Sequence, residues 1–271
     1  MAQRVATGTV LVLFGLVLIY FGGALMAVTG IVCIGVALYE EYKALRGAGH
    51  QITSWPTWTA LVISVPLALL CGQKVVIPVL MGACLITVSC VMFREQPKLY
   101  DALASVLPLF AVLLPGLCII ALSLVQPLSV QRTLLGLLIA VPILGDTLAF
   151  FVGSKVGGPK FCPPVSPNKT ISGSIAGLAG SLLAAVIVRA IAGAICAATT
   201  QPILPSWGVC VFLGIFGGAA SQMGDLFASL VKRHCGIKDY SNLFPGHGGM
   251  LDRLDSILFM SVVLYCATIL F

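Results

Sequence analysis

The stretch Val5–Tyr39, VATGTVLVLFGLVLIYFGGALMAVTGIVCIGVALY, contains no charged residue. As a single α-helix it would extend about 50 Å at about 1.5 Å per residue, which is longer than the hydrocarbon core of a bilayer, about 30 Å thick. Gly22 and Gly23 offer a turn near its middle. The stretch therefore predicts two membrane spans, rather than one span or a cleaved signal peptide.

The whole chain is too apolar for an ordinary soluble domain. Of its 271 residues, 59% are hydrophobic and 9% are charged, whereas about a quarter of the residues are charged in a typical soluble domain. Because backbone groups in hydrocarbon must be satisfied within each segment, we predict an all-α polytopic membrane protein with about nine transmembrane helices. These spans are expected at roughly residues 5–22, 24–39, 57–73, 75–93, 102–125, 133–153, 173–198, 207–230 and 254–271.

The chain divides into two parts by the placement of its polar motifs. Residues 1–100 are predicted to hold only N-terminal transmembrane helices, and residues 101–271 a C-terminal transmembrane catalytic region with signature loops. Within the second part, the small residues Gly173 and Gly177 are four apart, as are Gly214 and Gly218. This spacing predicts close contact between helices.

The basic residues predict the orientation of the chain. Most of its 15 Lys and Arg residues precede the first span or follow an even-numbered one: Arg4, Lys43, Arg46, Arg94, Lys98, Lys155, Lys160, Lys169, Lys232, Arg233, Lys238 and Arg253. The positive-inside rule therefore predicts a cytoplasmic N-terminus and cytoplasmic even-numbered loops. This asymmetry accounts for most of the net charge of +6, so no nucleic-acid partner is needed to explain it.

The nine acidic residues fall into two groups. Those at span ends are expected to be solvated, namely Glu40, Glu41, Glu95 and Asp101. Asp146 and Asp225 instead lie within apolar segments, VPILGDTLAFFVG and GGAASQMGDLFASL. Because an ionisable group at such depth is costly, both are candidates for a functional site.

The segment KRHCGIKDYSNLFPGHGGMLDRLDS, residues 232–256, is a hydrophilic island between the last two predicted spans. Asp252 and Asp255 open the last span, and Asp225 lies on the span before it. If these two helices pack together, the three carboxylates meet at one depth and provide the hard oxygen ligands that Mg²⁺ prefers. Gly248 and Gly249 would let backbone N–H groups approach an anion at the start of the last helix.

Cations accompany these carboxylates in two loops. Lys232, Arg233, Lys238 and Arg253 could neutralise a polyphosphate, or could simply follow the positive-inside rule. The loop GSKVGGPKFCPPVSPNKTISGSIAG, after the sixth span, is predicted to be a shaped loop with a phosphate-binding set, although it is not a Walker A motif. Its candidate residues are Ser166, Lys169 and Thr170. His247 either binds a phosphate or belongs to a turn.

The island resembles the C-terminal signature of the phosphatidate cytidylyltransferases, also called CDP-diacylglycerol synthases. The resemblance is carried by Ser229-x-x-Lys232-Arg233, Lys238-Asp239, Pro245-Gly246-His247-Gly248-Gly249 and Asp252-Arg253-x-Asp255. The upstream segments DTLAFFVG and SPNKTISG are similar to a second region of that family. This chain has Ser154 and Ser172 where the family commonly has a basic and an acidic residue.

The resemblance implies that CTP and phosphatidate react to give CDP-diacylglycerol and pyrophosphate, in phospholipid biosynthesis. It implies an integral multi-pass protein of the bacterial inner membrane, in contact with membrane lipid, with a cytoplasmic active site and a homodimeric assembly. The implied metal ligands, for one or two Mg²⁺ ions, are Asp225, Asp252 and Asp255. The other implied catalytic residues are Lys232, Arg233 and Lys238. The implied substrate-binding residues are Asp146, Ser166, Lys169, Thr170, Asp239, His247, Gly248, Gly249 and Arg253.

Two other functions remain open from the residues. A CTP-dependent enzyme acting on another lipid, such as a CDP-archaeol synthase or a polyprenol kinase, would show similar nucleotide chemistry. A transporter is less favoured, because the sequence has no clear internal repeat and its charges gather at one membrane face rather than near the midplane.

Overall fold

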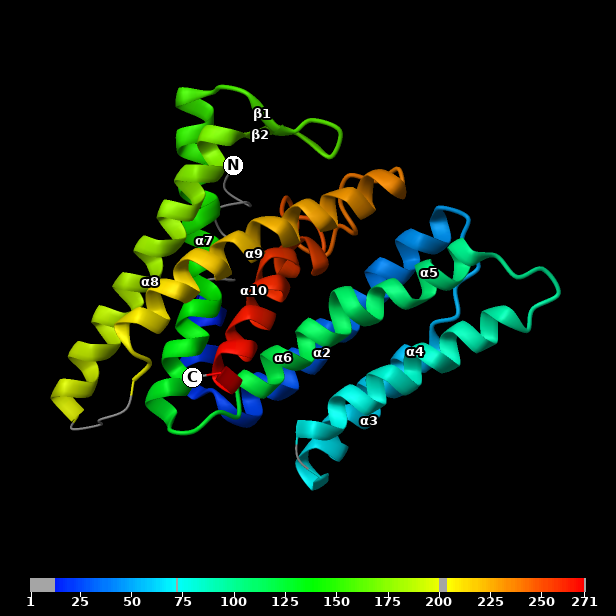
Figure 1. Cartoon of the computed structure of the whole chain (residues 1–271), viewed down its shortest axis with the longest axis horizontal. Coiled ribbons are helices and arrows are strands. Elements are labelled where there is room, and N and C mark those ends of the chain that lie inside the picture. Colours follow the sequence, from blue (N-terminus) through cyan, green and yellow to red (C-terminus); the bar gives the residue numbers. More distant parts are fainter. Residues whose placement is uncertain (1–12, 72, 200–203, 271) are drawn as a thin grey trace.

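The computed structural model describes residues 13–71, 73–199 and 204–270. Within these residues, six helices are long and apolar enough to cross a membrane, which confirms the predicted all-α membrane fold (Figure 1). The helices are α2 (Gly23–Gly47), α3 (Trp55–Cys71), α4 (Val76–Met92), α5 (Leu99–Pro108), α6 (Leu114–Leu122), α7 (Leu128–Val156), α8 (Ile171–Thr199), α9 (Trp207–His234) and α10 (Leu251–Leu270). Short turns are η1 (Gln73–Val75) and the π-helix η2 (Leu109–Leu113).

The predicted count of nine spans is not confirmed. Residues 13–21 of the first predicted span are helical and end before Gly22, whose φ is 56°, while residues 5–12 lie outside the described part of the chain. Helices α3 and α4 are apolar but have 17 residues each. At about 1.5 Å per residue such a helix extends about 25 Å, which is shorter than a bilayer core of about 30 Å.

A single rod built from α5, η2 and α6 occupies the centre of the bundle. Its most apolar window is 72% buried, more than in any of the other five long apolar helices among the described residues. Pro108 ends α5 and Pro115 lies in the first turn of α6, with the π-helix between them. Because proline lacks an N–H donor, a local change of helix type restores hydrogen bonding around these two positions.

The last four helices pack closely through small residues. A Cβ atom added at Gly173 of α8 would lie 2.8 Å from the carbonyl oxygen of Ala149 on α7. One added at Gly214 of α9 would lie 2.9 Å from both the Leu182 Cα and the Ala185 Cβ on α8. The predicted role of these glycines in helix contact is therefore confirmed. Figure 1 shows α7 and α8 running side by side along one edge, with α9 and α10 between them and the other helices.

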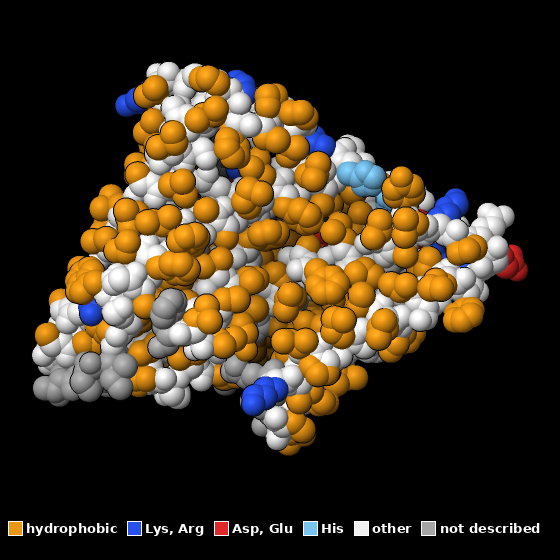
Figure 2. Space-filling view, in the orientation of Figure 1, with side chains coloured by type: hydrophobic (Ala, Val, Ile, Leu, Met, Phe, Trp, Pro, Cys, Tyr) orange, Lys and Arg blue, Asp and Glu red, His pale blue; other side chains and the backbone are white. Residues whose placement is uncertain are grey.

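The outer surface of this bundle is largely apolar. Figure 2 shows hydrophobic side chains over most of the visible face, with Lys and Arg in scattered places. A surface of this kind suits lipid contact, because soluble proteins rarely expose such continuous apolar area.

The loop between α7 and α8 forms the one β element in the described residues. Strands β1 (Lys160–Cys162) and β2 (Ser166–Thr170) pair antiparallel, with Lys160 opposite Thr170. The hairpin projects from the end of the α7/α8 pair (Figure 1). The sequence predicted a shaped loop here, and the structure adds its strand pairing.

Three acidic residues that we expected to be solvated are buried. Glu40, Glu41 and Asp101 are 3%, 1% and 4% exposed, whereas Glu95 is exposed as predicted. Helix α2 continues to Gly47 instead of ending at residue 39, so both glutamates lie on its packed end. Asp101 accepts a hydrogen bond from the Gln51 N–H at 3.1 Å, and its carboxylate lies 3.5 Å from the His50 Nδ1.

Replacing a contact glycine should weaken the bundle. Gly214→Ala is expected to lower the free energy of unfolding by about 1–3 kcal/mol, because the new methyl group would press on the α8 backbone. Gly82→Ala on α4 is the matched control, since its Cβ would meet nothing within 4 Å. The midpoints of thermal unfolding in one detergent measure the difference, and equal midpoints would refute close packing of α9 on α8.

Candidate active site

The polar residues of the chain's C-terminal half gather at one end of the bundle. The hairpin, the C-terminal end of α9 and the N-terminal turn of α10 all lie there. The Arg233 Nε atom on α9 is 3.4 Å from the carbonyl oxygen of Val165 in the hairpin turn, to which it donates a hydrogen bond. On the other side, the Lys232 Nζ atom is 2.7 Å from the Asp252 Oδ1 atom of α10. Residues separated by up to 90 positions thus share one polar region, as the sequence predicted.

A cavity of about 710 Å³ opens between α7, the hairpin, α8 and α9. Its polar walls include Asp146, Asn168, Lys169, Thr170, Gln222 and Asp225. It is also lined by several glycines and by Phe150 and Phe161, so a large part of its wall is apolar or backbone. A cavity of this size is within the range of small-molecule and cofactor sites, about 300–1,000 Å³.

The Lys169–Asp225 ion pair bridges two walls of this cavity. Lys169 belongs to β2 and Asp225 to α9, and their side chains are 31% and 28% exposed. The pair therefore stands between solvent and the apolar interior, where each partner remains accessible to a ligand. Both residues were candidates from the sequence, and the structure brings them into direct contact.

Two further carboxylates face the same region from other helices. Asp146 lies on α7 in the cavity wall and interacts electrostatically with Asp225 and Lys169. Asp255 on α10 interacts with both Asp225 and Asp146. Its Oδ1 atom also accepts a hydrogen bond from the Ser256 N–H at 2.7 Å. Three acidic groups from three helices thus share one neighbourhood with a single directly paired cation, Lys169.

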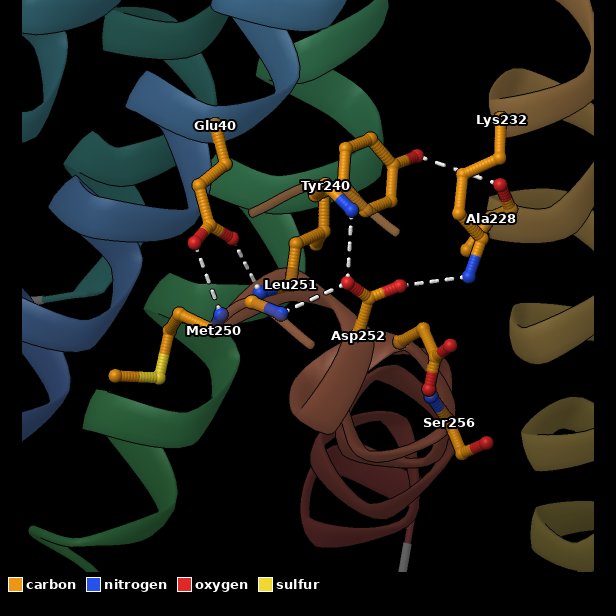
Figure 3. A network of polar contacts seen from close by, with 10 residues as sticks. Glu40, Ala228, Lys232, Tyr240, Met250, Leu251, Asp252 and Ser256 are labelled. Carbon is orange, nitrogen blue, oxygen red and sulfur yellow. Dashed lines mark hydrogen bonds and ion pairs between the residues drawn. The ribbon is translucent and has the colours of Figure 1, made fainter. Parts of the chain in front are cut away.

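Asp252 occupies a different environment from the other carboxylates. Its side chain is 3% exposed, and its Oδ1 atom accepts from the Lys232 Nζ. Its Oδ2 atom accepts from the backbone N–H groups of Tyr240 at 2.8 Å and Gly249 at 2.9 Å (Figure 3). Asp252 therefore joins the end of α9, and Tyr240 and Gly249 of the connecting loop, to the first turn of α10.

Tyr240 completes the packing around this ion pair. It is 7% exposed, and its hydroxyl donates to the carbonyl oxygen of Ala228 at 3.4 Å. Burial is the main cause that raises the pKa of its phenol far above the usual range, and Glu41, Asp252 and Asp255 add to it. The Lys232 Nζ lies 5.6 Å from the centre of the Tyr240 ring, a cation–π distance. The sequence analysis missed Tyr240, although it lies inside the signature segment.

Gly248 and Gly249, which precede α10, have structural roles that the sequence did not predict. The Gly249 N–H, predicted to face an anion, donates to Asp252 instead. Gly248 has a φ of 78°, and a Cβ atom there would lie 2.8 Å from the Asp252 Oδ2. Gly248 therefore allows the loop to fold tightly against Asp252.

The remaining predicted residues lie around these two centres. The Thr170 Oγ1 accepts from the Gly173 N–H at 3.1 Å and so caps α8. Ser166 is half-buried on β2. His247 is half-buried too, and its buried Nδ1 has no hydrogen-bond partner among the described residues. Four charged candidates lie at the exposed rim: Arg233, Lys238, Asp239 and Arg253.

A polar pair in the cavity wall was not among the predicted residues. The Gln222 Nε2 donates to the carbonyl oxygen of Ser174 at 3.0 Å, and the Ser174 hydroxyl donates back to the Gln222 Oε1. Gln222 precedes Asp225 by three residues on the same helix face. That spacing inside an apolar helix was the available signal.

The aspartates of this region offer carboxylate oxygens, which are the ligands that a hard divalent cation such as Mg²⁺ prefers. In the described ranges, no three Asp, Glu, His or Cys side chains already stand close enough to hold an ion. Asp252 already accepts hydrogen bonds from Lys232 and two N–H groups, which occupy three of the about four lone-pair positions of its carboxylate. The assignment of Asp225, Asp252 and Asp255 to a metal site stays a prediction.

Comparisons with known proteins agree with the signature. Phosphatidate cytidylyltransferases are similar to this chain in Bacillus subtilis strain 168 (40% identical over 126 residues), Brucella abortus biovar 1 strain 9-941 (44% over 132 residues) and Staphylococcus aureus strain COL (40% over 117 residues). These matches cover 46%, 47% and 43% of this chain, and 44%, 44% and 42% of the length of those proteins. The model of the cytidylyltransferase family matches residues 2–271. The chain therefore belongs to the cytidylyltransferase family.

Proposed function

We propose that this protein is a phosphatidate cytidylyltransferase, which transfers CMP from CTP to phosphatidate and releases pyrophosphate. The observation that carries the proposal is the Lys169–Asp225 pair in a cavity of about 710 Å³, at the polar end of an apolar helical bundle. Family membership and the names of the similar bacterial proteins support it. Such a cavity can receive a water-soluble nucleotide while the surrounding helices contact lipid.

The proposed reaction is a displacement at phosphorus. An anionic phosphate oxygen of phosphatidate attacks the α-phosphorus of CTP, a new P–O bond forms, and the bond to the β-phosphate oxygen breaks. The nucleophile is already ionised, so the site needs no strong general base. The main obstacle is repulsion between two polyanions, which fixed cations at the site reduce.

We propose that Asp225 and Asp255, with Asp146 beside them, hold Mg²⁺. A bound divalent cation supplies charge neutralisation to the reacting phosphates. Carboxylates brought together from three helices favour such a cation, because its positive charge offsets their mutual repulsion. Asp252 contributes by holding Lys232 and the start of α10, and its remaining lone-pair position could take part in metal binding.

The cations take separate roles in this proposal. Lys169 is released from Asp225 when the carboxylate gains another cation, and its ammonium group then contacts a phosphate. Arg233, Lys238 and Arg253 are exposed at the rim, where they attract an anionic nucleotide from the aqueous side. Ser166, Thr170, Asp239, His247, Gly248 and Gly249 shape the loops around the substrates.

We further propose that the site faces the cytoplasm from a bacterial inner membrane and that the protein is a homodimer. The bias of Lys and Arg toward one set of loops supports the orientation. The cytoplasm is also the compartment that supplies CTP. The dimer rests on the family resemblance alone.

The first test is the reaction itself. Purified protein with Mg²⁺, labelled CTP and phosphatidate should form a labelled liponucleotide and one pyrophosphate for each CMP transferred. Parallel reactions replace phosphatidate with an unsaturated archaeal ether lipid or with a polyprenol. Labelled product with either of these alone would contradict the proposed acceptor and favour another lipid enzyme.

The second test separates the two aspartate environments. Asp225→Asn should reduce kcat by about 100-fold or more, because a proposed ligand of the divalent cation is lost, while the thermal midpoint stays near that of the wild type. Asp252→Asn should reduce both activity and stability. Removing one partner of a buried ion pair costs about 3–5 kcal/mol.

The measurements are steady-state kinetics and thermal unfolding in the same detergent. Glu95→Gln is the control for loss of a carboxylate, since Glu95 is exposed and lies outside the site. Near wild-type turnover of Asp225→Asn at saturating Mg²⁺ would contradict the role of Asp225. An unchanged midpoint for Asp252→Asn would contradict the structural role of its ion pair.

A further inference from the structure

Glu40, near the C-terminal end of α2, is joined to the segment before α10. Its side chain accepts three hydrogen bonds from donors that follow it by 201 to 211 positions. The Oε1 atom accepts from the Ser241 hydroxyl at 2.6 Å and from the Met250 N–H at 3.0 Å. The Oε2 atom accepts from the Leu251 N–H at 2.8 Å. Figure 3 shows Glu40 reaching both backbone nitrogens.

This carboxylate satisfies backbone groups that α10 cannot satisfy itself. The first N–H groups of an α-helix have no acceptor within the helix, and a side chain just before the helix normally caps them. Here the cap for Met250 and Leu251 comes from a different helix. A carboxylate in this position also interacts favourably with the positive end of the helix dipole. Since Glu40 is 3% exposed, water cannot replace it easily.

Gly249 lies directly against the Glu40 carboxylate. A Cβ atom at Gly249 would lie 2.6 Å from the Glu40 Oε1 and 2.7 Å from its Oε2. The absence of a side chain at this position therefore allows α2 to reach the start of α10. This contact explains the residue type at 249 without requiring an anion there.

The turn held by Glu40 carries the acidic residues of the proposed site. Asp252 follows Leu251 directly, and Asp255 lies one turn further along α10. Asp252 holds the same turn from the other side through Tyr240 and Gly249 (Figure 3). A shift of residues 249–251 would consequently move Asp255 relative to Asp225 on α9.

We propose that Glu40 is a positioning residue of this site, which fixes the N-terminal turn of α10 so that Asp255 stays close to Asp225. Glu40 itself contacts neither substrate. The proposal rests on the proposed cytidylyl transfer for its catalytic consequence. Its structural part, the restraint of residues 249–251 by α2, stands on the three hydrogen bonds.

The experiment compares Glu40→Gln with wild type and with the exposed control Glu95→Gln. In glutamine an amide NH₂ replaces one carboxylate oxygen and faces an N–H donor, so at least one cap is lost. Hydrogen exchange followed by mass spectrometry should show about 10-fold or faster exchange in peptides covering residues 249–251. Activity should show kcat lowered about 10- to 100-fold, with KM for CTP changed less than about 2-fold, as expected for displaced catalytic groups.

Two further variants keep the test decisive if Glu40→Gln does not insert or fold. Ser241→Ala removes one of the three hydrogen bonds and should give a smaller effect of the same kind. Gly249→Ala displaces the carboxylate from the opposite side, and should reproduce the kcat loss. The double variant Glu40→Gln/Gly249→Ala should lose less than the product of the two single losses, because both act on one contact.

Each outcome has a defined meaning. Faster exchange at residues 249–251 together with lower kcat supports the proposal. Unchanged exchange, or faster exchange with wild-type kcat, overturns it. If the wild-type protein transfers no CMP to phosphatidate, the proposed function fails, while the exchange data still decide whether Glu40 restrains α10.

Discussion

The start of α10 depends on two buried carboxylates that approach it from opposite sides. Glu40 accepts from Met250 and Leu251, and Asp252 accepts from Lys232, Tyr240 and Gly249. In an apolar bundle, an unpaired backbone N–H or a buried charge without a partner costs several kcal/mol. These two carboxylates therefore hold the segment between α9 and α10 in the conformation that pairs the N–H groups of Tyr240, Gly249, Met250 and Leu251. The position of Asp255 follows from that conformation.

Two Lys–Asp ion pairs of this bundle differ in how far they are buried. Lys232 and Asp252 are almost completely removed from solvent and hold backbone segments together. Lys169 and Asp225 are about 30% exposed and border the cavity. A partly solvated pair exchanges partners at low cost, because water and ligands compensate each group as it separates. The same two residue types thus form a buried structural pair in one place and a partly exposed pair at the cavity in the other.

Hydropathy predicted where most long helices lie, because a bilayer imposes both length and composition on each span. Helices α7 and α9 begin or end within about five residues of their predicted limits, the usual uncertainty of such boundaries. Helix α2 extended further, since Glu40 and Glu41 look like the start of a loop when their partners are unknown. The sequence predicted that Asp225 and Asp255 come together if the last two helices pack, and in the structure Asp255 interacts electrostatically with Asp225. The sequence could not show that Asp252 turns toward Lys232 and Tyr240, because that choice depends on tertiary hydrogen bonds.

The long separation between Glu40 and its donors has a consequence for biosynthesis. A ribosome adds about 5–20 residues per second, so roughly 10–40 s pass between synthesis of the glutamate and of Leu251. During that interval α2 is already made, but its carboxylate has none of its final partners. A chain that stalls before α10 leaves this acidic group uncompensated among apolar helices.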